Sequence, residues 1–123
     1  YGRLGADGKP RQLHIPQALD VTRLRRPARP VGPQGREIRE EGCVRTLLAS
    51  CEYFTVTHMK ITEYALCAGE KSFQSLVCLD GDALILDRGR ALLTFGKGDS
   101  IFIPAGFGRY TVKGGCEILL TEV

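Results

Sequence analysis

The sequence predicts an all-β fold, an antiparallel β-barrel or jelly-roll that follows a connector containing one short helix. Of the 123 residues, 43% are hydrophobic and 25% are charged, a composition typical of one folded domain. Beyond residue 43, short apolar runs alternate with turn signals rich in Gly and Asp, whereas five of the six prolines precede Gln34. We therefore expect a connector over residues 1–42 and a barrel over residues 43–123.

The connector carries the only helix that the sequence predicts. Residues 15–21 suit two turns of helix, because Pro16 is tolerated in a first turn. The stretch Ala6–Lys9 reads as a turn, and residues 22–42 read as an extended, loop-like crossing. We therefore expect this segment to be a connector.

Eight short strands are expected in the barrel. Turn signals between them lie at 80–82, 88–89, 96–98, 105–106 and 114–115. The expected strands span 44–49, 53–62, 73–79, 83–86, 91–95, 100–103, 109–112 and 117–121. The expected core includes Val77, Leu84, Leu86, Leu93, Ile101, Ile103, Ile118 and Leu120.

Charge and hydropathy narrow the classes of partner. The longest apolar run, 83–86, is far shorter than the roughly 20 residues that cross a bilayer, so no membrane segment is expected. Residues 1–36 carry a charge of +6 and the rest −3. The basic run from Arg23 to Arg29 resembles a nucleic-acid arm, but it has no aromatic residue to stack on bases. Nucleic acid is therefore the least favoured partner.

The cysteines predict the cellular location of the protein, and the first residue predicts that the chain is a fragment. There are five cysteines, an odd number with no C-x-x-C pair. We expect reduced thiols in a cytoplasmic protein. The chain begins at Tyr1 and its one methionine is Met59, so we expect a fragment of a longer protein.

One stretch carries a specific motif. Gly98-Asp99-Ser100-Ile101-Phe102-Ile103-Pro104-Ala105-Gly106 resembles the second motif of the cupin family, which ends in a metal-binding histidine three residues after its last glycine. The residue at that position is Arg109, and a guanidinium has no lone pair for a metal.

The first cupin motif is also degenerate. If Gly81 is the glycine that closes its hairpin, Gln74 occupies the glutamate position, and Glu70 and Ala68 lie near the histidine positions. The four degenerate ligand positions are Ala68, Glu70, Gln74 and Arg109. We therefore predict no metal or other cofactor in this chain.

The sequence shows no catalytic residue. Only His14 and His58 are histidines, and neither has a second ligand at metal spacing. The serines lack the glycines of a nucleophile elbow. Asp80, Asp82 and Asp87 cluster at expected turns, where Asp serves the backbone.

The chain as a whole resembles the C-terminal portion of bacterial short-form type I mannose-6-phosphate isomerases. The stretches that carry the resemblance are 1–3, 8–15, 18–21, 54–56, 98–105 and 116–119. Such enzymes interconvert mannose 6-phosphate and fructose 6-phosphate with a zinc ion. The family's ligands, and an arginine that precedes the Tyr-Gly-Arg stretch, do not map onto this chain. The resemblance implies a catalytically silent second cupin that packs against an upstream catalytic half.

Another class of function remains open. The chain could be a free-standing cupin-like module that binds a sugar or sugar phosphate. Arg109 is then the candidate substrate-binding residue, because an arginine facing the barrel mouth can hold an anion with two hydrogen bonds.

Overall fold

A computed structural model describes residues 2–10, 12–22, 24–25 and 32–123. The chain divides into two compact units, residues 1–31 and residues 32–123. The basic run from Arg23 to Arg29 falls mostly on residues outside the described part. No helix in the described part is long and apolar enough to cross a membrane.

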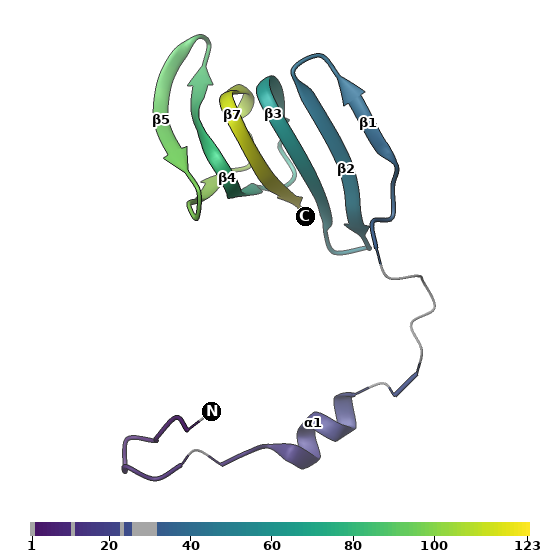
Figure 1. The fold of residues 1–123 in the computed structure, drawn as a ribbon, viewed down its shortest axis with the longest axis vertical. Coiled ribbons are helices and arrows are strands. Elements are labelled where there is room, and N and C mark those ends of the chain that lie inside the picture. Colours follow the sequence, from purple (N-terminus) through teal and green to yellow (C-terminus); the bar gives the residue numbers. More distant parts are fainter. Residues whose placement is uncertain (1, 11, 23, 26–31) are drawn as a thin grey trace. The chain divides into compact units, whose positions relative to one another are not determined.

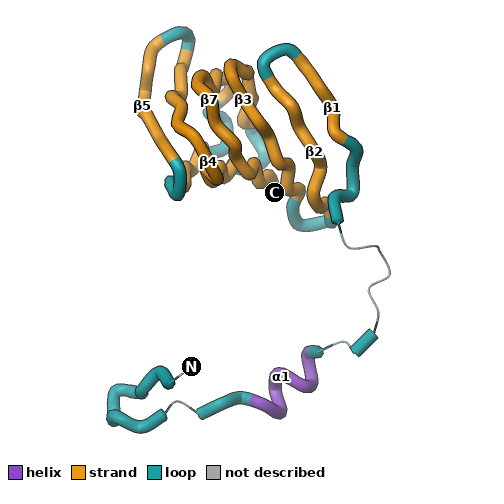
Figure 2. The backbone as a smooth tube through the Cα atoms, viewed as in Figure 1, coloured by secondary structure: helices purple, strands orange, loops and turns teal. Residues whose placement is uncertain are grey.

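The first unit contains the expected helix. Helix α1, drawn in purple in Figure 2, spans Ile15–Val21, which confirms the predicted bounds. Pro16 lies in its first turn, and the backbone N–H of Thr22 closes its last turn on the carbonyl of Leu19. A turn at residues 6–9 brings Leu4 and Pro10 into a β-bridge. None of the residues of α1 is buried.

The second unit is one curved antiparallel sheet, as the sequence predicts. Along the sheet the strands follow the order β1, β2, β3, β7, β4 and β5, and β6 pairs with β4 (Figure 1). Long strands pair over most of their lengths: β3 with β7, and β7 with β4. The strands are β1 (Glu37–Glu40), β2 (Cys43–Ser50), β3 (Thr55–Ala68), β4 (Gln74–Asp87), β5 (Arg90–Gly96), β6 (Ser100–Ile103) and β7 (Gly108–Glu122).

The strand count differs from the expected eight. Strand β4 runs through the expected turn at 80–82, and β7 runs through the expected turn at 114–115. One register shift lies between Cys78 and Asp80 in the pairing of β4 with β7. Another lies between Ile61 and Glu63 in the pairing of β3 with β7, opposite Cys116 and Lys113, so the strands bend there and do not reverse. Gly81 has φ 74°, and a Cβ on it would lie 2.0 Å from the carbonyl oxygen of Gly115. Glycine is required at this bend because it allows both the left-handed backbone and the close approach.

The connector is also shorter than predicted. Strand β1 lies inside the expected loop-like crossing and pairs with β2, with Glu37 opposite Thr46 and Glu40 opposite Cys43. Gln34 and Gly35 also donate backbone hydrogen bonds to carbonyls of β2. Residues 32–42 therefore lie with the sheet. Sequence patterning missed β1 because its four residues are all exposed, with three charged side chains.

The turns that join β4 to β5, β5 to β6 and β6 to β7 lie where the sequence predicts them. Arg88 and Gly89 both have positive φ, 48° and 81°, which is the backbone of a type I′ two-residue hairpin.

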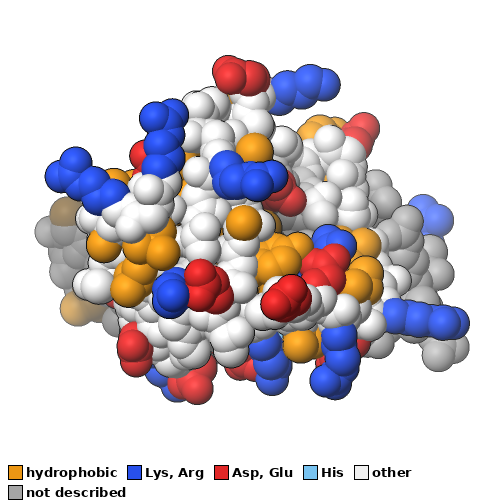
Figure 3. Space-filling view, turned by 90° about the horizontal axis from the view of Figure 1, so that it is seen from above, with side chains coloured by type: hydrophobic (Ala, Val, Ile, Leu, Met, Phe, Trp, Pro, Cys, Tyr) orange, Lys and Arg blue, Asp and Glu red, His pale blue; other side chains and the backbone are white. Residues whose placement is uncertain are grey.

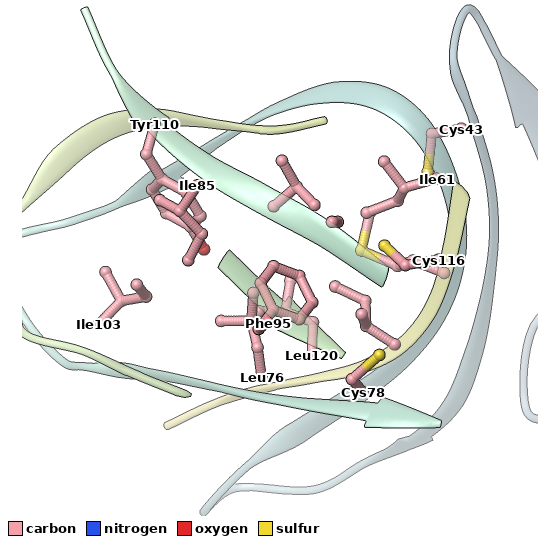
Figure 4. Close-up of a cluster of buried hydrophobic side chains, with 14 of the residues drawn as sticks. Cys43, Ile61, Leu76, Cys78, Ile85, Phe95, Ile103, Tyr110, Cys116 and Leu120 are labelled. Carbon is pink, nitrogen blue, oxygen red and sulfur yellow. The ribbon is translucent and has the colours of Figure 1, made fainter. Parts of the chain in front are cut away.

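The core lies on the concave face of the curved sheet (Figure 4). Of the eight expected core residues, Ile103, Ile118 and Leu120 are buried, and Ile101 packs against the core while partly buried. Leu84 and Leu86 are only half-buried, because their neighbours Ala83 and Ile85 face inward. Val77 is 36% exposed because its neighbours Leu76 and Cys78 point into the core. Leu93 is 40% exposed on the edge strand β5. The prediction for these four residues was wrong because an unbroken apolar run does not reveal which face is inside.

Candidate functional site

Of the four degenerate cupin positions, only that of Gln74 lines the cavity described below, to which strands β2, β3, β7 and β4 contribute. Gln74 begins β4 and is 3% exposed. Ala68 is buried at the end of β3, and Glu70 is exposed in the loop that follows. The sequence analysis took Gly81 as the glycine that closes the hairpin of the first cupin motif, but Gly81 lies inside β4. The assignment of these four residues to metal-ligand positions therefore remains a prediction.

Gln74 is the centre of a buried hydrogen-bond chain. The hydroxyl of Tyr110 donates to Gln74 Oε1 over 2.7 Å. Gln74 Nε2 donates to Glu122 Oε1 over 2.7 Å and to the carbonyl of Cys67 over 3.1 Å. Tyr110 is 1% exposed, and burial followed by the nearby charge of Glu122 raises the pKa of its phenol. Both side-chain amide hydrogens of Gln74 are therefore satisfied.

A second polar group lies at the open edge of the same cavity. The guanidinium of Arg45 donates to Glu40 Oε1 over 2.9 Å, and the hydroxyl of Tyr64 donates to the other oxygen of Glu40. The hydrogen bond from Tyr64, with a further contribution from Arg45, lowers the pKa of the Glu40 carboxyl. That same bond raises the pKa of Tyr64. Arg45 Nε is buried and has no hydrogen-bond partner among the described residues.

Four of these side chains, those of Arg45, Tyr64, Gln74 and Glu122, line a cavity of about 230 Å³, which we call the lumen cavity. Cross-strand pairing explains why they meet: Arg45 lies opposite Met59, and Gln74 lies opposite Glu122. Its polar wall is formed by Arg45, Thr57, Tyr64, Gln74 and Glu122, and its apolar wall by Met59, Ala65, Leu66, Cys67 and Leu120.

Arg109 lies away from this cavity. It is exposed on β7 beside the buried Tyr110, and successive side chains of a strand point to opposite faces. Its substrate-binding role remains a prediction. The arginine that lines the lumen cavity is Arg45.

Sequence reasoning missed Arg45, Tyr64, Tyr110 and Glu122 because their proximity depends on strand pairing. The separation of Gln74 and Glu122 is 48 residues, and that of Glu40 and Tyr64 is 24 residues. One local signal was present: Tyr110 and Val112 alternate with polar Arg109 and Thr111. This period of two places Tyr110 on the buried face.

The donors of the lumen cavity do not fit zinc, which prefers four nitrogen, sulfur or carboxylate ligands in a tetrahedron. The amide of Gln74 is already engaged at both of its polar atoms. His58 lies 3.7 Å from Glu117 in an ion-pair geometry, outside the lumen cavity. No group of three His, Cys, Asp or Glu residues in the described part of the chain could hold a metal ion.

A wider hollow of about 680 Å³ lies where the strands bend, and its floor includes Gly42, Gly81 and Gly115. Its charged residues are already paired: Lys60 lies 2.5 Å from Glu117, and Lys97 lies 3.0 Å from Asp80. Their hydrogen bonds lower the pKa values of both carboxyls. Acidic and basic side chains are likewise interleaved on the face seen in Figure 3. This hollow therefore presents no concentrated charge to a ligand.

Comparison with known proteins places the fold in one family. The family model "Mannose-6-phosphate isomerase, cupin domain" matches residues 44–123. Mannose-6-phosphate isomerase ManA of Bacillus subtilis (strain 168) is 26% identical over 123 residues, which is all of this chain and 38% of that protein. The chain thus spans well under half of the relative's length.

Solved structures agree. The crystal structure of the mannose 6-phosphate isomerase from Bacillus subtilis superposes with a TM-score of 0.78 at 24% identity, covering 100% of this chain and 38% of the other. KdgF from a Halomonas species superposes with a TM-score of 0.59 at 14% identity, covering 72% of this chain and 86% of the other. At these identities the likeness is one of fold.

Proposed function

Because this chain belongs to the mannose-6-phosphate isomerase cupin-domain family, we propose that it is the catalytically silent C-terminal cupin of such an isomerase. The parent enzyme interconverts mannose 6-phosphate and fructose 6-phosphate, and its zinc ion and acid–base groups belong to an upstream half. The relatives support this division, since the matched part is 38% of their length. The five free cysteines support a cytoplasmic location, where thiols are kept reduced.

The observation that carries the proposal is the donor set at the degenerate positions. Ala68 has no side-chain donor atom, and Arg109 has no lone pair to offer a metal. Gln74 is committed to Tyr110, Glu122 and Cys67. Glu70 keeps a carboxylate but is exposed in the loop after β3, so the set offers at most one ligand. A zinc-dependent proton transfer between C1 and C2 of the sugar needs several ligands together with an acid–base group.

The role we propose for the chain is to pack against the catalytic half and support its site. A suitable surface lies on the outer face of β4 and β6. Phe73 and Phe102 are 38% and 64% exposed, and their rings lie 4.9 Å apart. Val77 and Leu79 continue this apolar strip along β4, at 36% and 39% exposure. Contiguous exposed apolar surface is typical of a contact with another protein surface, and we assign it to the upstream half.

A complementation assay tests the proposal. The isolated chain should not interconvert the two sugar phosphates even with added zinc, and mixing it with a separately expressed upstream half should restore activity. Phe102→Lys should weaken this restoration, because it places a charge in the proposed interface. Leu92→Lys is the matched control, since Leu92 is 48% exposed on β5, outside the apolar strip.

Two results would contradict the proposal. Isomerase activity of the isolated chain would mean that it holds a complete catalytic site. Equal restoration by both lysine variants would mean that the strip on β4 and β6 does not contact the catalytic half.

A further inference from the structure

The lumen cavity retains hydrogen-bonding capacity that the fold does not use. Among the described residues, only one carboxylate oxygen of Glu122, Oε1, accepts a bond. The hydroxyl of Tyr64 donates to Glu40 and keeps its lone pairs, and Thr57 adds another hydroxyl to the wall. Arg45 Nε also lacks a partner within the described part, but it is shielded from solvent and is not counted among the groups open to a ligand. The cavity thus combines acceptors and donors in a small volume.

The charges of the cavity disfavour an acidic ligand. Glu122 lines it directly, and Glu40 lies just behind Arg45 at 2.9 Å. Two carboxylates and one guanidinium leave a net charge of −1. This charge repels a phosphate group, although Glu40 and Glu122 are exposed and water and salt weaken the repulsion. Hydroxyl groups, by contrast, donate to carboxylates at no charge cost.

The size and the apolar wall narrow the ligand further. A volume of about 230 Å³ corresponds to roughly eight waters at about 30 Å³ each, which suits one sugar ring. Met59 and Leu120 are 2% and 5% exposed and belong to the apolar part of the lining. Such a wall suits the C–H face of a sugar, whereas the polar wall suits its hydroxyls.

We propose that the lumen cavity is a binding site for an uncharged monosaccharide or cyclic polyol. The hydroxyls of the ligand donate to Glu122 and accept from Thr57, and its C–H face packs on Met59 and Leu120. The site belongs to this chain alone. It uses no metal and no residue of an upstream half, so its test is independent of the isomerase assignment.

The experiment is a titration of the isotope-labelled chain with D-mannose, followed by nuclear magnetic resonance. We expect saturable shifts at the side-chain amide of Gln74 and the backbone amides of Thr57 and Tyr64, with a millimolar Kd, so titration to about 100 mM suffices. Mannose 6-phosphate, which differs only by the acidic group, should bind about tenfold more weakly.

Two variants make the test specific. Thr57→Val keeps the shape and removes one hydroxyl, so D-mannose should bind about 5- to 10-fold more weakly. Thr94→Val is the matched control on exposed β5 and should leave binding unchanged. Glu122→Gln removes a negative charge and should narrow the gap between mannose 6-phosphate and D-mannose.

Three results would overturn the inference. These are an absence of saturable shifts at the lining residues, tighter binding of mannose 6-phosphate than of D-mannose, and equal binding by the two threonine variants. None of them would bear on complementation with an upstream half.

Discussion

Removing the hydroxyl of Tyr110 breaks the hydrogen-bond chain at its most deeply buried member. Tyr110→Phe deletes one oxygen, and Gln74 Oε1 then loses the 2.7 Å bond that satisfies it. Both residues are nearly inaccessible, at 1% and 3% exposure, so water cannot replace the bond without rearrangement. An unsatisfied buried acceptor costs about 1–3 kcal/mol.

The expected loss of stability in Tyr110→Phe corresponds to a measurable change in Tm. A loss of about 2 kcal/mol in a unit of this size lowers Tm by roughly 8–16 °C, which calorimetry or urea unfolding resolves. Tyr53→Phe is the matched control, because Tyr53 is 71% exposed. Its free energy of unfolding should change by less than about 0.5 kcal/mol.

A double variant separates loss of the bond from loss of packing. Tyr110→Phe combined with Gln74→Leu should cost less than the sum of the two single changes, because the first change has already broken the bond that they share. The reasoning is refuted if Tyr110→Phe is no more destabilising than Tyr53→Phe, or if the two changes at Tyr110 and Gln74 are simply additive.

Three further predictions concern thiols, alkaline pH and the core. A thiol reagent at neutral pH should label two cysteines quickly and three only after unfolding, because Cys51 and Cys67 are exposed whereas Cys43, Cys78 and Cys116 are buried; a count of five fast thiols would contradict this. Burial raises the pKa values of Cys43 and Cys116 to about 11 from 9.0. The folded state keeps these protons to a higher pH than the unfolded state does. The two thiols therefore contribute fully to the free energy of unfolding below pH 9, and this contribution, at most about 3 kcal/mol per thiol, is lost as pH rises toward 11. Urea unfolding at pH 8 and pH 10.5 checks this, and unchanged stability at the higher pH would refute it. Ile103→Ala should cost about 2–5 kcal/mol, because Ile103 is 4% exposed, whereas Phe102→Ala, at 64% exposure, should cost far less; similar losses would mean that the register of β6 is wrong.

Proline and glycine in the sequence were enough to predict the bounds of α1 and β6. Pro16 and the apolar spacing predicted α1 with its observed bounds, and Gly98 with Pro104 bracketed β6 correctly. These signals act within a few residues, because proline and glycine restrict or release the backbone at their own positions. The all-β class and the antiparallel arrangement followed from the same reasoning.

The sequence analysis predicted turns at 80–82 and 114–115, where β4 and β7 only bend, because glycine is typical of both a bend and a turn. Gly81 and Gly114 both adopt positive φ, as turn glycines do, yet the chain continues in its strand. The difference lies across the sheet, where a Cβ on Gly114 would lie 2.6 Å from the carbonyl oxygen of Asp82. Only pairing with a distant strand decides between the two outcomes, so a local pattern cannot distinguish them.

The place of Gln74 in a degenerate ligand position remains a prediction, and its hydrogen-bond partners could not be predicted from the sequence. Its place in the degenerate motif came from spacing, whereas its partners Tyr110 and Glu122 come from another strand. A carboxylate at the position of Gln74 would be buried within hydrogen-bond distance of Glu122, and two such groups require a cation or a shared proton. An amide supplies a donor and an acceptor without charge, so it satisfies Tyr110 and Glu122 without a cation. If Gln74 stands where a related barrel holds a metal ligand, as the motif predicts, the amide is the side chain that keeps this polar interior satisfied when no metal is bound.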